Sequence, residues 1–240
     1  MESSQRASRV RTSMALLLVG SLLSLVEARG QSAPWIGTWA ASQVRDESGK
    51  SFNQQTLRQI VHTSVGGRMA RVRISNLFGT QPLIIEDVHL ARRSSASAIV
   101  ADTDRQVRFK GKSAVKIQPG TFAVSDPVDF SVPRLGDVSI SIYLPSPTGR
   151  ATYHSSIFQT SYVAEGDVSG SASLPNFKTS QSYYFLTNLD VQDRSALGSI
   201  VALGASITDG SNSTPENPRG PCMRQKLLLP TADRWSSSRW

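Results

Sequence analysis

The segment VALGASITDG, from Val201 to Gly210, has the residue types of a nucleophile loop. Three apolar residues lead into Gly204, and Ser206 follows within a turn of small residues. A serine between the end of a strand and the start of a helix is held on a rigid edge, where helix N-terminal amides stabilise an oxyanion. The segment therefore makes Ser206 a candidate nucleophile for acyl transfer.

The residues around Ser206 restrict this chemistry. Thr208 stands where the G-x-S-x-G elbow of α/β-hydrolases has its second glycine, so the segment does not match that elbow. Asp209 is either a turn former or a local brace, and the glycine that follows it, Gly210, favours the turn. A serine hydroxyl is a weak nucleophile without an adjacent base, so the positions of the histidines decide what Ser206 can do.

The chain has three histidines, and none of them follows Ser206. They are His62, His89 and His154, and all three lie in a region with the alternating pattern of strands. We expect ordinary strand or surface histidines at these positions. The single cysteine, Cys222, leaves no partner for an intrachain disulfide, and no metal-type spacing accompanies it.

The region before Ser206 alternates apolar and polar residues with period two. In DVSISIYL, residues 137–144, the apolar side chains share one face and the serines share the other; residues 70–76 and 86–92 alternate in the same way. Such alternation is typical of half-buried antiparallel strands. Glycine and proline turn signals separate the segments at short intervals. These patterns predict a β-sandwich or jelly-roll domain over residues 29–195.

The pattern changes near Asp190. The polar stretch DVQDRSALGS predicts a linker or a short helical turn. The stretch SIVALG, residues 199–204, has no alternation and suits a strand covered on both faces, as in a parallel α/β sheet. We therefore expect a mainly-β fold, in which the N-terminal sandwich is followed by the first strand of a truncated α/β domain over residues 196–216.

The segment ALGASITDG resembles the first motif block of the SGNH, or GDSL-type, hydrolases. Four upstream segments are similar to the N-terminal β-rich domain of a secreted bacterial subgroup, in which a β-sandwich precedes the SGNH esterase domain. They are WIGTWAAS, LRQIVHTSVGG, RVRISNLFGT and YYFLTNLDV. The resemblance covers about residues 35–215.

The resemblance implies a carboxylic ester hydrolase with Ser206 as nucleophile and its backbone N–H as an oxyanion donor. Gly204, Asp209 and Gly210 belong to the supporting loop, and no metal or organic cofactor is implied. Relatives act on small acyl or aryl esters, or on acetylated plant polysaccharides.

The chain also departs from this family pattern. Ala205 replaces the usual aspartate, and residues 207–240 contain neither Gly-x-Asn-Asp nor Asp-x-x-His. Loss of the base lowers turnover by several orders of magnitude, so we expect this chain to be inactive as it stands. The alternative is a non-catalytic secreted β-sandwich that binds a glycan or a protein.

The two ends of the chain carry further signals. A basic stretch, the apolar run of residues 14–26 and a Val26-Glu27-Ala28 cleavage pattern predict a signal peptide over residues 1–28 and a secreted or periplasmic protein. An N-terminal anchor is the alternative. Residues 217–240 are proline-rich and basic, and we expect a poorly ordered tail produced by a frameshift or premature stop near Asn217. The formal charge of +8 comes without a recognition motif for nucleic acid, so no such partner is expected.

Overall fold

The computed structural model describes residues 33–193, 198–199, 201 and 204–205. Within these residues the fold is mainly β, as the sequence predicts: strands β1 to β17 are accompanied by one short 3₁₀ helix, η1 (Ala101–Thr103). All strand pairs are antiparallel. The alternating pattern of the sequence therefore identifies the fold class correctly.

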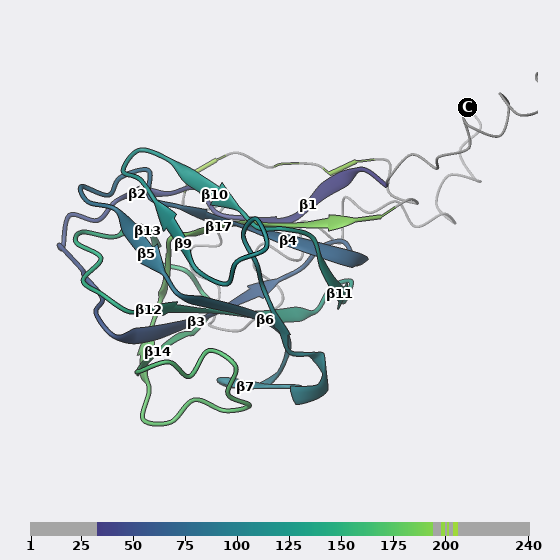
Figure 1. Ribbon diagram of the computed structural model, residues 1–240. Helices are drawn as coiled ribbons and strands as arrows, with labels where there is room; N and C mark the ends of the chain where they lie inside the picture. The colour runs from purple at the N-terminus through teal and green to yellow at the C-terminus, as the bar shows by residue number, and fades with distance from the viewer. Residues whose placement is uncertain (1–32, 194–197, 200, 202–203, 206–240) are drawn as a thin grey trace, which may run out of the picture. The chain divides into compact units, whose positions relative to one another are not determined.

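Two large sheets and two small ones make up this part of the chain (Figure 1). The five-stranded sheet contains β1 (Trp35–Ala40), β17 (Leu186–Gln192), β4 (Gly67–Ser75), β10 (Phe122–Val124) and β11 (Val128–Val132). The seven-stranded sheet contains β15 (Lys178–Ser180), β14 (Ser161–Glu165), β3 (Gln55–His62), β12 (Asp137–Leu144), β6 (Asp87–Ser95), β7 (Ala98–Ile99) and β8 (Arg105–Gln106). The small sheets pair β16 (Ser182–Tyr184), β13 (Thr152–Ser155) and β2 (Val44–Arg45), and β5 (Leu83–Ile85) with β9 (Val115–Ile117).

The two large sheets share one hydrophobic core. Val72 and Ile74 of β4 and Leu189 of β17 belong to the same buried cluster as Val88 of β6 and Ile140 of β12. Each strand contributes every second residue, because successive side chains of a strand point to opposite faces. Two antiparallel sheets that enclose a common core form the sandwich layers that the sequence predicts.

The seven-stranded sheet is buried on both faces at its centre. Ser139 and Ser141 of β12, on the face away from the shared core, are only 1% and 2% exposed. The sequence predicts a half-buried strand here, and that detail is wrong. The chain between β14 and β15 covers this outer face, where Leu174 and Val168 pack with Ile60 of β3.

The C-terminal elements of the sequence prediction fall largely outside the described residues. β17 continues to Gln192, so the change of pattern near Asp190 precedes the true end of the strand. Ser199, Val201 and Gly204 lie in no strand, and Val201 is 81% exposed, in contrast to the buried strand expected over residues 199–204. The proposed signal peptide, residues 1–28, and the tail, residues 217–240, lie outside the described residues. No helix of the described part is long and apolar enough to cross a membrane.

Candidate functional site

The predicted nucleophile loop is only partly described. Gly204 is exposed and belongs to no strand, whereas Ser206, Asp209 and Gly210 lie outside the described residues. Among the described residues, charged clusters with histidines lie on the outer face of the seven-stranded sheet.

The first cluster links His62, Asp137 and Arg93. His62 at the end of β3 faces Asp137 at the start of β12 in the strand register. The Nδ1–H of His62 donates to Oδ1 of Asp137 at 2.7 Å, and Nη1 of Arg93 on β6 donates to the other carboxylate oxygen at 2.9 Å. Both oxygens of one carboxylate are thus held by cationic or potentially cationic groups from the two flanking strands.

The balance of charge in this cluster favours the ionised carboxylate. Burial opposes ionisation of Asp137, but the hydrogen bonds and positive charges of His62 and Arg93 outweigh it, so the pKa of Asp137 lies below its usual value. Hydrogen bonds that involve a charged group are shorter and stronger than neutral ones. Asp137 therefore stays charged and fixes the orientation of the His62 ring.

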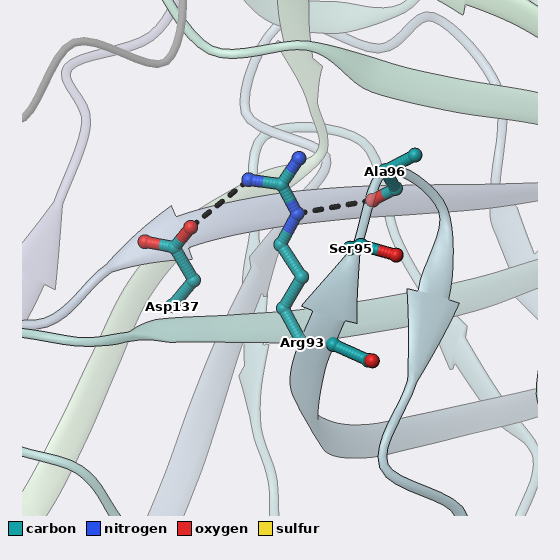
Figure 2. Close-up of a pocket in the computed structure, with 5 residues that line it drawn as sticks. Arg93, Ser95, Ala96 and Asp137 are labelled. Carbon is teal, nitrogen blue, oxygen red and sulfur yellow. Dashed lines mark hydrogen bonds and ion pairs between the residues drawn. The ribbon is translucent and has the colours of Figure 1, made fainter.

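A pocket of about 250 Å³ opens beside this cluster. Arg93, Ser94, Ser95, Ala96 and Asp137 line it. Figure 2 shows the Arg93 guanidinium between the Asp137 carboxylate and the carbonyl oxygen of Ala96, to which its Nε donates at 3.0 Å. The pocket thus offers a fixed cation, a carboxylate and two hydroxyl groups, which is a set of donors and acceptors for a polar ligand.

The His62–Asp137 pair has the geometry of the base and orienting group of a hydrolytic triad, in which a carboxylate holds the histidine Nδ1. No described serine hydroxyl is hydrogen-bonded to His62, although Ser94 and Ser95 lie in the adjoining pocket. The part of the chain that the structure describes therefore contains no complete Ser-His-Asp arrangement around this pair.

The second cluster surrounds His89 of β6. Its Nδ1 contacts Oδ2 of Asp104 at 2.7 Å, and its Nε2 contacts Oδ2 of Asp87 at 3.1 Å. Burial disfavours the charged imidazolium, but the hydrogen bonds and negative charges of both aspartates outweigh it and raise the pKa of His89. Oγ of Ser169 donates to Oδ1 of Asp167 at 2.6 Å and lies 3.3 Å from Oδ2 of Asp87. A Cβ at Gly170 would lie 3.0 Å from Cε1 of His89, so the segment that follows β14 packs closely against the ring.

The third histidine, His154 of β13, has a backbone partner. Its Nδ1–H donates to the carbonyl oxygen of Ser42 at 2.6 Å. This bond ties β13 to the chain between β1 and β2. The expectation of an ordinary strand or surface histidine at this position stays a prediction.

A fully buried arginine, Arg58 of β3, organises the outer face. Its Nε donates to Oγ of Ser141 at 2.8 Å, Nη1 to the carbonyl of Ser97 at 2.7 Å, and Nη2 to the carbonyls of Ser169 and Ser171 at 2.9 and 2.7 Å. Burial lowers the pKa of Arg58 to about 10, and the charge of Asp104 opposes that shift. The guanidinium stays protonated at neutral pH and fastens the chain after β14 onto the sheet.

The sequence predictions missed these clusters for a topological reason. His62 and Asp137 are 75 positions apart, and only the register of β3 with β12 makes them neighbours. Arg58 lies in β3, where apolar and polar residues alternate only in part. This pattern gives little indication that the arginine is buried. The described residues contain no group of three or more His, Cys, Asp or Glu side chains that could hold a metal ion.

Comparison with known proteins yields little similarity. No protein-family model matches the chain, and no curated protein matches it. Among solved structures, a clostridial cysteine protease, Cwp84 after propeptide cleavage, aligns with a TM-score of 0.38 and 8% identity. The alignment covers 68% of this chain and 41% of the protease chain, so it spans less than half of that protein. A TM-score of this size carries no conclusion about function.

Proposed function

We propose that the protein is a secreted carboxylic ester hydrolase of the SGNH type, with Ser206 as its nucleophile. The observation that supports this proposal most is the block ALGASITDG, which follows a mainly-β domain along the chain. The last strand of that domain, β17, ends at Gln192, shortly before the block begins. This order, β domain first and serine block second, is the order of the secreted subgroup that the sequence resembles.

Within this proposal the β domain is the non-catalytic part of the protein. Among the described residues, His62 and His89 contact aspartates and His154 contacts a backbone carbonyl. The resemblance to the SGNH type assigns the nucleophile to Ser206, and the backbone N–H of Ser206 to the oxyanion. The substrate is a small acyl ester or an acetylated polysaccharide, and the reaction needs no cofactor.

The 240-residue chain is expected to be a poor catalyst by itself. No histidine follows Ser206 in its sequence, and a serine without a base is weakly nucleophilic. Ser206 is therefore the reacting group in a chain whose residues 207–240 contain no histidine base to activate it.

Hydrolysis of p-nitrophenyl acetate tests Ser206 as the reacting group. The purified chain, its Ser206→Ala variant and buffer alone are compared at the same pH. We expect a rate close to that of buffer, with any excess removed by Ser206→Ala. An excess rate that is equal in both proteins would contradict Ser206 as the nucleophile.

The coding sequence tests the assignment to the SGNH type. The DNA downstream of the Asn217 codon, translated in the two alternative frames, is expected to encode Gly-x-Asn-Asp followed by Asp-x-x-His. If neither frame contains these blocks, the assignment to the SGNH type fails.

A further inference from the structure

Five exposed cations gather in one short segment of the β domain, residues 105–116. They are Arg105, Arg108, Lys110, Lys112 and Lys116, and the segment contains no acidic residue. We call these five residues the cationic strip. The segment begins with β8, at the edge of the seven-stranded sheet, and ends in β9, where Lys116 pairs with Ile84 (Figure 1).

The backbone under the strip is well fixed. Val107, Phe109 and Ile117 are at most 4% exposed and anchor the segment in the core, so the charged side chains between them must face outward. Phe109 and Lys112 exchange two backbone hydrogen bonds of 2.7 and 3.2 Å around a two-residue turn.

The turn itself has the geometry of a type I′ hairpin. Lys110 and Gly111 both have positive φ values, of 53° and 80°, which is the requirement of that turn. The carboxylate of Asp126 accepts the backbone N–H groups of both residues, at 3.0 and 2.6 Å. The strip therefore presents its charges from a rigid support and loses little conformational freedom of the backbone on binding.

The charges of the strip are not neutralised within the described residues. None of the five cations forms an ion pair there. Arg105 donates to the backbone carbonyls of Asp102 and Asp104, and Arg108 donates to the carbonyl of Gly111 and the side-chain oxygen of Gln106. Carbonyl and amide oxygens orient the guanidinium groups but leave their charge available to an external anion.

We propose that the cationic strip binds an anionic polysaccharide of the carboxylated, uronic-acid class. Clustered positive charges attract a polyanion and release its counterions, which makes such binding strong at low salt. One uncharged neighbour of the strip, Gln118, is an exposed amide that can pair with sugar hydroxyl groups, whereas the amide of Gln106 is held by Asp87 and Arg108. This surface lies on the β domain and acts independently of ester hydrolysis at Ser206.

Two other polyanions fit the surface less well. Single-stranded nucleic acids stack their bases on exposed aromatic rings, whereas the only aromatic residue of the segment, Phe109, is 4% exposed. Anionic membranes are held by cations together with apolar residues that insert between the lipids. Here the large apolar residues of the segment face the core, and exposed Ile84 lies beside Lys116. The exposed ring of Phe122 on the nearby strand β10 is covered by the guanidinium of Arg73, 4.8 Å from the ring centroid.

The test measures binding of a fluorescein-labelled oligogalacturonate to the full chain by fluorescence anisotropy. We expect affinity at low salt that falls as salt is added, and no binding of a labelled neutral cello-oligosaccharide. In the variant Lys110→Gln/Lys112→Gln/Lys116→Gln, loss of three cations that face the sugar carboxylates should weaken binding roughly tenfold or more.

A charge-matched control distinguishes a site from general attraction. The variant Lys50→Gln/Arg134→Gln/Lys178→Gln removes three exposed cations from other parts of the domain and should bind within about twofold of the wild type. Circular dichroism confirms that both variants fold. Equal weakening in the two variants would overturn the proposal, because only net charge would then matter. Tighter binding to a labelled DNA duplex, or to phosphatidylcholine vesicles that contain phosphatidylserine, would also overturn it.

Discussion

The clusters around His62 and His89 share a contact and differ in their balance of charge. Both histidines lie on strands that flank β12, and each holds an aspartate oxygen with Nδ1 at 2.7 Å. Around Asp137 a single carboxylate meets His62 and Arg93, whereas around His89 a single imidazole meets two carboxylates. In each cluster, the one group of opposite charge is stabilised in its charged form by its two neighbours. The pKa of Asp137 is therefore lowered and the pKa of His89 is raised.

The comparison also explains what these sites do for the protein. A histidine between two carboxylates is a stabilised cation and a poor general base, because its proton is held by both partners. A histidine against one carboxylate shared with an arginine keeps the orientation seen in hydrolytic triads, and Ser94 and Ser95 line the adjoining pocket. Each cluster joins neighbouring segments of the β domain through charge-assisted hydrogen bonds, so we expect both to contribute to its stability.

The largest expected effect comes from removing Arg58, the buried arginine that fastens the chain after β14 onto the sheet. Arg58→Met leaves the carbonyls of Ser97, Ser169 and Ser171 without their donors inside the fold. Loss of one member of a buried charged network costs roughly 3 kcal/mol or more. Urea unfolding followed by fluorescence measures the free energy of unfolding.

The control for this prediction is Arg71→Met. Arg71 forms an ion pair with Asp190, but its side chain is 32% exposed, so its loss should cost less than about 1 kcal/mol. A cost for Arg58→Met no larger than for Arg71→Met would show that the buried guanidinium is dispensable.

A smaller effect is expected from Asp137→Asn, about 1–2 kcal/mol at neutral pH, because His62 and Arg93 both lose their carboxylate. The folded-state pKa of Asp137 is lowered. Its stabilisation is therefore present above the ordinary pKa of aspartate and is lost as pH falls through the lowered value.

Stability measured against pH checks this prediction. The variant should lose less stability than the wild type on acidification and should keep the wild-type slope near neutral pH. If the variant lost as much stability as the wild type at acidic pH, the role of Asp137 would be contradicted.

The smallest effect is expected from His89→Gln, about 1 kcal/mol at pH 5, where the wild-type imidazole is charged. The folded-state pKa of His89 is raised above 6.5, so its stabilisation is complete below the ordinary value and is lost as pH rises through the folded value. Thermal unfolding at pH 5 and pH 8 should show a larger deficit at pH 5. A larger deficit at pH 8 would reverse the assignment of charge around His89.

The sequence predicts two of the strands that carry the clusters, over residues 86–92 and 137–144, but not the clusters themselves. The alternation of DVSISIYL identifies β12, and the turn signals around it separate β12 from its neighbours. Which residues meet depends on register, and a shift of one position would place Asp137 on the opposite face from His62. Local patterns carry no information about that register, nor about the chain that covers the outer face and buries Arg58, Ser139 and Ser141.

The candidate nucleophile shows the reverse situation. Ser206 is conspicuous in the sequence because a motif of few residues carries its chemistry, whereas its position in space lies outside the described residues. The cationic strip is predictable from the sequence only in part. Its charges are plain in the sequence, but their rigid hairpin support and their lack of acidic partners within the described chain emerge only from the fold.

The most direct test of the charge balance is an NMR titration of histidine side chains in the folded protein. With ¹³C-labelled histidine, the ring signals of His62, His89 and His154 are assigned by single substitutions and followed against pH. The account predicts that His89 titrates above 6.5, and that Asp104→Asn moves this midpoint down because one of the two carboxylates has lost its charge. A His89 midpoint at or below 6.5, unmoved by Asp104→Asn, would contradict the account.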